Sequence, residues 1–254
     1  MRLGFLGSGN MATALARGIG DPVLCTDPVA ARADALATLT GGEAVADGRT
    51  LAERTDVVVL GHKPGQLEAA ARDVAPSARA VLSMLAGVST ARLRDAYPGV
   101  PVVRIMPNTP AGIGKGVIAV ATEPDGPRAD EADVRDGILA LLRRCATVVE
   151  LPESQLAAAT ALFGVLPAYV ALVAEATVDA AVRHGIGPDE AGRMAAAGLE
   201  GAAALLRDGG HDTLAVRRAV TSPGGSTARG LRELDRHGVR EAIQAAFDAA
   251  ADAS

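Results

Sequence analysis

The 254-residue sequence is poor in aromatic side chains, with three phenylalanines, two tyrosines and no tryptophan. Hydrophobic residues nevertheless make up 49% of the chain, so small aliphatic side chains must form the core. Such a core depends on close helix packing and on extensive contact between subunits. The two cysteines, Cys25 and Cys145, lie far apart on predicted strands, and this pattern does not predict a disulfide framework. We expect both to be buried, reduced thiols.

Several other features are absent. No cluster of Lys and Arg stands out and the net charge is −5, so a nucleic-acid partner is not expected. No uninterrupted apolar stretch of about 18 residues predicts a membrane span. No spacing of His, Cys, Asp or Glu predicts a metal site. The N-terminus enters a strand pattern at once, so we expect no signal peptide and a soluble, cytoplasmic protein.

A glycine-rich turn directly follows the first apolar run. Residues 3–6 lead into Gly7-Ser-Gly-Asn-Met-Ala12 and then into a helical pattern. This order is typical of a dinucleotide-binding fingerprint: Gly7 permits the tight turn and Gly9 lets backbone approach a pyrophosphate. The helix start attracts the phosphate charge. The alternative is an ordinary glycine-rich turn. The residues assigned to the nucleotide are Gly7, Gly9, Asn10 and Met11.

Asp27, twenty positions after Gly7, ends the second predicted strand. A carboxylate there can accept hydrogen bonds from an adenosine ribose diol and would repel the additional phosphate of NADP. Arg32, on the next helix, could instead reach that phosphate, and Asp27 could merely cap the helix. The residues therefore favour NADH over NADPH only slightly.

Residues 1–151 alternate between strand and helix patterns, which predicts an α/β Rossmann domain with a doubly wound, mostly parallel sheet. Residues 152–254 show only helical patterns, which predicts an all-α domain. The stretch 169–182 is apolar on more than one face and therefore needs partners on all sides, which a second subunit can supply. The predicted strands are 3–6, 22–26, 56–60, 79–83, 100–106, 117–122 and 146–150; one predicted helix spans 129–144.

Two loops follow predicted buried strands, at the edge of the sheet where ligands of open α/β sheets bind. Lys63 and Pro64 occupy the first loop and face the cofactor in our interpretation; alternatively, the loop simply starts a helix. The second loop carries Asn108 and Thr109 between two prolines. Its polar side chains can hydrogen-bond a nicotinamide or a substrate, whereas a mere connector has little need for two stiffening prolines.

A third loop, residues 220–227, precedes a helix in the C-terminal half. Its hydroxyls, its two glycines and the helix start form a natural cradle for a small carboxylate. Taken alone, it could equally be a capped connector between helices. Together with a nicotinamide site, such a cradle favours hydride transfer to a small carboxylated acceptor.

In combination, these segments closely resemble the pyrroline-5-carboxylate reductase family, over essentially the whole chain. The matching stretches are Gly7–Met11, Lys63-Pro64, Ala86–Val88, Arg104–Ala111, Pro167–Tyr169 and Thr221–Thr227 followed by Gly230-Leu231.

The resemblance implies proline biosynthesis, that is, hydride transfer from NAD(P)H to the C=N bond of 1-pyrroline-5-carboxylate to give L-proline. It also implies C-terminal helices that interlock into a homodimer, which often assembles into a larger ring. By resemblance, Asn108 and Lys63-Pro64 lie beside the nicotinamide. Thr160 matches a family threonine near the imine nitrogen and is a candidate for supplying or relaying its proton. Those implied to hold the substrate carboxylate are Ser222, Gly224, Gly225, Ser226 and Thr227, and the candidate catalytic residues are Thr160 and Thr227.

The chain departs from the family at two places. Where the family reads Thr-x-x-Ser-Gly-Ser-Gly-Pro-Ala-Tyr, this chain carries Phe163, Val165 and Leu166 in place of two hydroxyls and a glycine. An additional glycine, Gly65, follows Lys63-Pro64. The first departure leaves two alternatives open: a reductase of a different, more apolar cyclic imine in specialised metabolism, and a non-catalytic nucleotide-binding relative.

Overall fold

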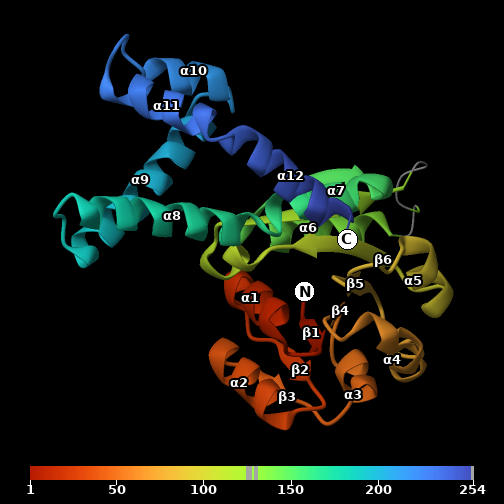
Figure 1. Cartoon of the computed structure of the whole chain (residues 1–254). Helices are drawn as coiled ribbons and strands as arrows, with labels where there is room; N and C mark the ends of the chain where they lie inside the picture. Colours follow the sequence, from red (N-terminus) through yellow and green to blue (C-terminus); the bar gives the residue numbers. More distant parts are fainter. Residues whose placement is uncertain (124–127, 129–130, 253–254) are drawn as a thin grey trace. The chain divides into compact units, whose positions relative to one another are not determined.

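The computed structural model describes residues 1–123, 128 and 131–252. The chain forms two compact units, Met1–Gly164 and a second that begins at Val165 (Figure 1). The first unit is the α/β part and the second contains only helices in its described residues, so both predicted fold classes are confirmed. The predicted helix 129–144 begins with Ala129 and Asp130, which lie outside the described residues. Residues 253 and 254, at the end of the predicted all-α domain, also lie outside them.

The first unit is built on an eight-stranded sheet in the order β3-β2-β1-β4-β5-β6-β7-β8. All neighbours are parallel except β6 and β7, and the strand order reverses between β1 and β4. Open α/β sheets bind their ligands at such a reversal. The strands are β1 Leu3–Leu6, β2 Leu24–Thr26, β3 Glu43–Ala44, β4 Val57–Leu60, β5 Val81–Ser83, β6 Val102–Pro107, β7 Gly116–Thr122 and β8 Ala146–Pro152.

Helices cover both faces of this sheet. Leu15, Leu36 and Ile138 bring α1, α2 and α6 into one buried cluster, and a second cluster holds α3, α4 and α5. Cys25 and Cys145 are buried free thiols, as predicted. The helices of this unit are α1 Asn10–Ile19, α2 Ala30–Thr40, α3 Gly48–Glu53, α4 Leu67–Val74, α5 Thr90–Ala96, α6 Ala132–Leu142 and α7 Leu156–Phe163, with short 3₁₀ turns η1 Pro64–Gln66, η2 Thr109–Ile113 and η3 Glu153–Gln155.

The change of pattern near residue 151 corresponds to the end of β8 at Pro152. Beyond it, α7 still belongs to the first unit, where Leu156 and Phe163 pack on Ala119 and Ala121 of β7. The domain boundary between residues 151 and 152 therefore stays a prediction about where the substrate-binding part begins.

The second unit leaves much apolar surface exposed. Its longest apolar helix, α8, has no buried residue, and Leu166, Leu172 and Val173 are each 47–65% exposed. Residues 153–183 are long and apolar enough to cross a membrane by length and composition, with 17% of the most apolar window buried. Such a stretch alone is weak evidence of a membrane span. The helices are α8 Leu166–Arg183, α9 Pro188–Asp208, α10 Thr213–Ala219, α11 Ser226–Arg236 and α12 Val239–Asp252.

A backbone contact between α1 and η2 joins two of the segments singled out by the sequence. A Cβ on Gly18 would lie 2.0 Å from the carbonyl oxygen of Ala111, and one on Gly112 would lie 3.3 Å from the Cα of Ala14. Because backbone meets backbone here, no side chain can move aside to make room. The contact holds the fingerprint helix against the loop that carries Asn108.

We predict that Gly18→Ala lowers the free energy of unfolding by about 1–3 kcal/mol, because the new methyl group overpacks a rigid contact. Gly137→Ala is the matched control. It also lies inside a helix of this unit, but its Cβ would meet only the mobile tip of Met1. That variant should be neutral or gain up to about 1 kcal/mol. Urea denaturation measures both; equal stability of the two variants would contradict the prediction.

Candidate active site

The turn after β1 requires glycine at its first position. Gly7 has φ +102°, and its N–H donates to the carbonyl of Thr26 at 2.8 Å. A Cβ on Gly7 would lie 2.7 Å from the carbonyl carbon of Gly61. Both the backbone conformation and the space therefore exclude a side chain. As a result, the fingerprint turn directly contacts the loop that carries Lys63.

The start of α1 has the properties of an anion site. Its N-cap is Gly9, which caps no N–H with a side chain, and its first turn contains no acidic residue. A Cβ on Gly9 would meet nothing within 4 Å, so the space beside the free N–H groups is open. The hydroxyl of Ser8 is buried there and has no hydrogen-bond partner among the residues that the structure describes. Free donors and open space fit the pyrophosphate of a dinucleotide.

Asp27 has protein partners that the sequence did not reveal. One carboxylate oxygen accepts the N–H of Ser8 at 2.8 Å, and the other accepts that of Val29 at 2.9 Å. The carboxylate thus ties the turn after β1 to the turn after β2. Each oxygen keeps a further lone pair for a ribose hydroxyl. Arg32 is exposed and forms no ion pair within the described residues, so it stays available to a phosphate.

The loop after β4 is internally bonded. The N–H of Lys63 donates to the side-chain oxygen of Gln66 at 3.1 Å, and Pro64 opens η1. The His62 ring contacts the Lys63 carbonyl oxygen through Nδ1 at 2.9 Å, and its Nε2 is buried without a partner. Burial lowers the pKa of His62, which favours the neutral ring. The Lys63 side chain itself is exposed.

Asn108 lies at the carboxyl end of β6, where the sequence placed it, and is 93% buried. Its side-chain oxygen accepts the N–H of Val117 at 2.8 Å, and its amide nitrogen donates to the carbonyl of Phe163 at 3.1 Å. The side chain therefore joins β7 to the end of α7. One amide N–H and one oxygen lone pair remain for a ligand.

Thr160 also has an internal partner. Its hydroxyl donates to the carbonyl of Leu156, one turn earlier in α7, at 2.7 Å. The hydroxyl oxygen keeps its lone pairs, but its proton is engaged. The neighbouring Phe163 side chain is buried against β7, so its bulk fills the core of the first unit.

The candidate substrate loop of the second unit, residues 220–227, leads into α11. Gly224 has φ +70°, and the N–H of Gly225 donates to the carbonyl of Ser222 at 3.1 Å. The positive φ requires glycine at position 224, whereas a Cβ on Gly225 would meet the Ser222 hydroxyl, which can rotate away. Gly225 is the N-cap and provides no side-chain cap. The first N–H groups of the eleven-residue α11 and the Ser226 and Thr227 hydroxyls therefore stay available to an anion.

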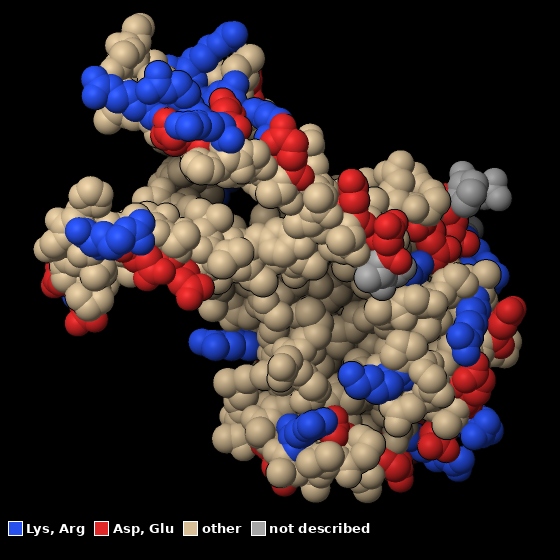
Figure 2. Space-filling view, viewed as in Figure 1, with Lys and Arg blue, Asp and Glu red and all other residues tan. Residues whose placement is uncertain are grey.

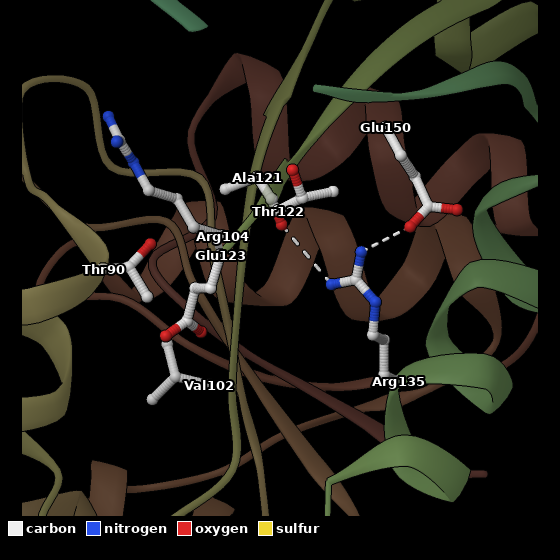
Figure 3. Close-up of a pocket in the computed structure, with 8 residues that line it drawn as sticks. All are labelled: Thr90, Val102, Arg104, Ala121, Thr122, Glu123, Arg135 and Glu150. Carbon is white, nitrogen blue, oxygen red and sulfur yellow. Dashed lines mark hydrogen bonds and ion pairs between the residues drawn. The ribbon is translucent and has the colours of Figure 1, made fainter. Parts of the chain in front are cut away.

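A small charged pocket of about 100 Å³ lies apart from these loops (Figure 3). Its charges are all paired: Figure 3 shows Arg135 bonded to Glu150, at 2.5 Å, and to the Ala121 carbonyl. Arg104 and Glu123 pair with residues outside the lining, Glu153 and Arg94, each at 2.5 Å. We interpret it as a structural ion-pair network. Within the described residues, no group of three or more His, Cys, Asp or Glu could hold a metal.

Asn108→Ala should lower the free energy of unfolding by roughly 1–3 kcal/mol, because it leaves the Val117 N–H and the Phe163 carbonyl without their partner. Thr109→Ala is the control, since Thr109 is exposed and its hydroxyl forms no hydrogen bond within the described residues. Chemical denaturation measures both. A stability loss no larger than that of the control would show that the two bonds contribute little.

Comparison with known proteins gives a consistent result over the whole chain. The family described as pyrroline-5-carboxylate reductase dimerisation matches residues 153–254, and the family described as NADP oxidoreductase, coenzyme F420-dependent, matches residues 2–87. The pyrroline-5-carboxylate reductase of Synechocystis sp. is 34% identical over 259 residues, covering 98% of this chain and 96% of that protein.

Solved structures agree. A pyrroline-5-carboxylate reductase from Coxiella burnetii superposes with a TM-score of 0.85 at 27% identity, covering 99% of this chain and 96% of that one. The pyrroline carboxylate reductase of Plasmodium falciparum, solved with NADP bound, gives 0.83 at 25% identity and the same coverage. An imine reductase from Streptomyces aurantiacus shares the fold alone, at 19% identity.

Proposed function

Because this chain belongs to the pyrroline-5-carboxylate reductase family, we propose that it reduces the C=N bond of 1-pyrroline-5-carboxylate with NAD(P)H, giving L-proline. The observation that carries the proposal is the open start of α1, where Gly9 leaves both space and free N–H groups for a pyrophosphate. The second glycine-capped helix start, at α11, supplies the matching site for the substrate carboxylate.

The residues divide the work as follows. Gly7, Gly9, Asn10 and Met11 hold the dinucleotide, and Lys63-Pro64 and Asn108 border its nicotinamide end. When bound, the reduced nicotinamide supplies the hydride that the imine carbon accepts. Ser222, Gly224, Gly225, Ser226 and Thr227 hold the substrate carboxylate and so orient the C=N bond.

The imine nitrogen must gain one proton as its carbon gains the hydride. We assign the relay of this proton to the Thr160 hydroxyl, which takes a proton from water as it gives its own to the nitrogen; Thr227 is the second candidate. The Thr160 hydroxyl donates to Leu156, so it must rotate away from that carbonyl to deliver or relay a proton. The helix loses little by this, because the Leu156 carbonyl also lies within the backbone ladder of α7.

We further propose a homodimer in which a second subunit covers the exposed apolar side chains of α8. The dimerisation family matched at residues 153–254 supports this arrangement and accounts for the apolar stretch 153–183 without a membrane. Assembly of dimers into a ring and a cytoplasmic location complete the proposal; both rest on the family resemblance.

One observation favours a different, more apolar cyclic imine: the apolar Leu166 replaces a family glycine and is 47% exposed at the start of α8. Phe163 argues the other way because its side chain lies in the core. Rates with 1-pyrroline-5-carboxylate and with an alkylated analogue separate the two. Nucleotide binding without turnover of any imine would identify a non-catalytic relative.

Thr227→Val should raise the KM for 1-pyrroline-5-carboxylate about 10- to 100-fold, since one hydrogen bond to a charged group is lost. The KM for the nucleotide should stay unchanged. Thr213→Val, a threonine at the start of α10 outside the loop, is the matched control. Loss of nucleotide binding in Thr227→Val would refute the assignment of this loop to the substrate.

For the cofactor we propose a preference for NADH, since the Asp27 carboxylate lies at the end of β2 and opposes a 2′-phosphate. A repulsion of about 1 kcal/mol between this carboxylate and the 2′-phosphate would make kcat/KM roughly fivefold higher for NADH than for NADPH. Asp27→Asn should bring the ratio of the NADH rate to the NADPH rate closer to one, when both rates are measured side by side. The opposite result, an NADPH preference abolished by Arg32→Ala, would instead assign the 2′-phosphate to Arg32.

A further inference from the structure

Two neighbouring helices of the second unit, α10 and α11, carry several arginines within twenty residues of the sequence. Figure 2 shows positively charged side chains gathered over α10 and α11, where the sequence contains arginine but no lysine. On these two helices the acidic residues Glu233 and Asp235 are outnumbered, and Glu233 lies 3.7 Å from one arginine, Arg236. The arginines of α10 and α11 are Arg217, Arg218, Arg229, Arg232 and Arg236.

One of them, Arg229, contacts the glycine-rich loop before α11. Its Nε donates to the carbonyl oxygen of Gly224 at 3.2 Å. Arg229 is the fourth residue of α11, and side chains on a helix lean toward its N-terminus. The guanidinium is therefore held at the helix start, beside the residues that leave their N–H groups uncapped.

The rest of this guanidinium is unused. Within the described residues, its two terminal nitrogens form no hydrogen bond and no ion pair. A guanidinium fixed by Nε keeps donors in a planar fork, and such a fork matches a carboxylate. The helix start adds its own partial positive charge at the same place.

We propose that Arg229 determines substrate specificity by pairing with the carboxylate of the cyclic imine, so that carboxylated imines are favoured over neutral ones. This inference rests on the proposed function, in which the loop 222–227 holds that carboxylate. The Nε bond to Gly224 gives Arg229 a second effect, since it stabilises the left-handed turn of the loop.

Kinetics with 1-pyrroline-5-carboxylate and with neutral 1-pyrroline test the proposal. Arg229→Gln removes the charge but keeps an N–H donor for Gly224. It should raise the KM for the carboxylated imine at least tenfold with little change in kcat, and leave 1-pyrroline unaffected. Arg229→Lys, which keeps the charge without the fork, should recover part of the loss.

Arg232→Gln is the matched control, because it removes the same charge from the same helix without touching the loop. It should change neither substrate more than about threefold. Equal effects of Arg229→Gln and Arg232→Gln would overturn the proposal, because they would show that the substrate responds only to the overall positive charge of this surface. Equal losses on both imines in Arg229→Gln would overturn it too, since they indicate a purely structural role.

Binding of L-proline in the presence of NAD⁺, measured by calorimetry, separates this inference from the proposed function. If the wild-type protein binds L-proline but reduces neither imine, the proposed activity is refuted. The affinity of Arg229→Gln for L-proline then still tests the role of Arg229. At least tenfold weaker binding by Arg229→Gln supports that role. Equal affinities, or no binding by the wild type, overturn it.

Discussion

Direct contact between backbone segments at glycine positions is the constraint on which the first unit depends. Gly7 brings the turn after β1 against Gly61, and Gly18 brings α1 against Ala111. These two contacts place three loops at one end of the sheet: the fingerprint, the Lys63 loop and the Asn108 loop. A chain with so few aromatic residues cannot fill wide gaps between elements, so it brings the elements together instead.

Both units contain a helix whose N-cap is a glycine. Gly9 and Gly225 are both extended N-cap residues, and neither forms a side-chain cap. A Ser or Asp in either place would satisfy the helix N–H groups internally and stabilise the isolated helix. Glycine gives up that stability and leaves the N–H groups free, which is the basis for the two anion sites that we propose at these helices.

Three side chains assigned to ligands by the sequence turned out to have protein partners. Asp27 bonds Ser8 and Val29, Asn108 bonds Val117 and Phe163, and Thr160 bonds Leu156. Each keeps some hydrogen-bonding capacity, so these roles stay predictions. Their internal bonds show that such residues also shape the loops, and substituting one would change loop geometry together with any direct contact.

The sequence by itself determined the fold class, because the periods of strands and helices and the positions of Gly and Pro are local properties. It correctly placed the fingerprint turn and the change to helices after β8. It missed β3, since Glu43–Ala44 has no strand pattern and pairs only because β2 offers an edge. Only the tertiary structure revealed the partners of Asp27 and Asn108, the ion pairs of Arg104 and Arg135, and the contact of Arg229 with Gly224. These depend on which side chains meet in space, and residues as far apart as Asn108 and Phe163 meet only after the chain has folded.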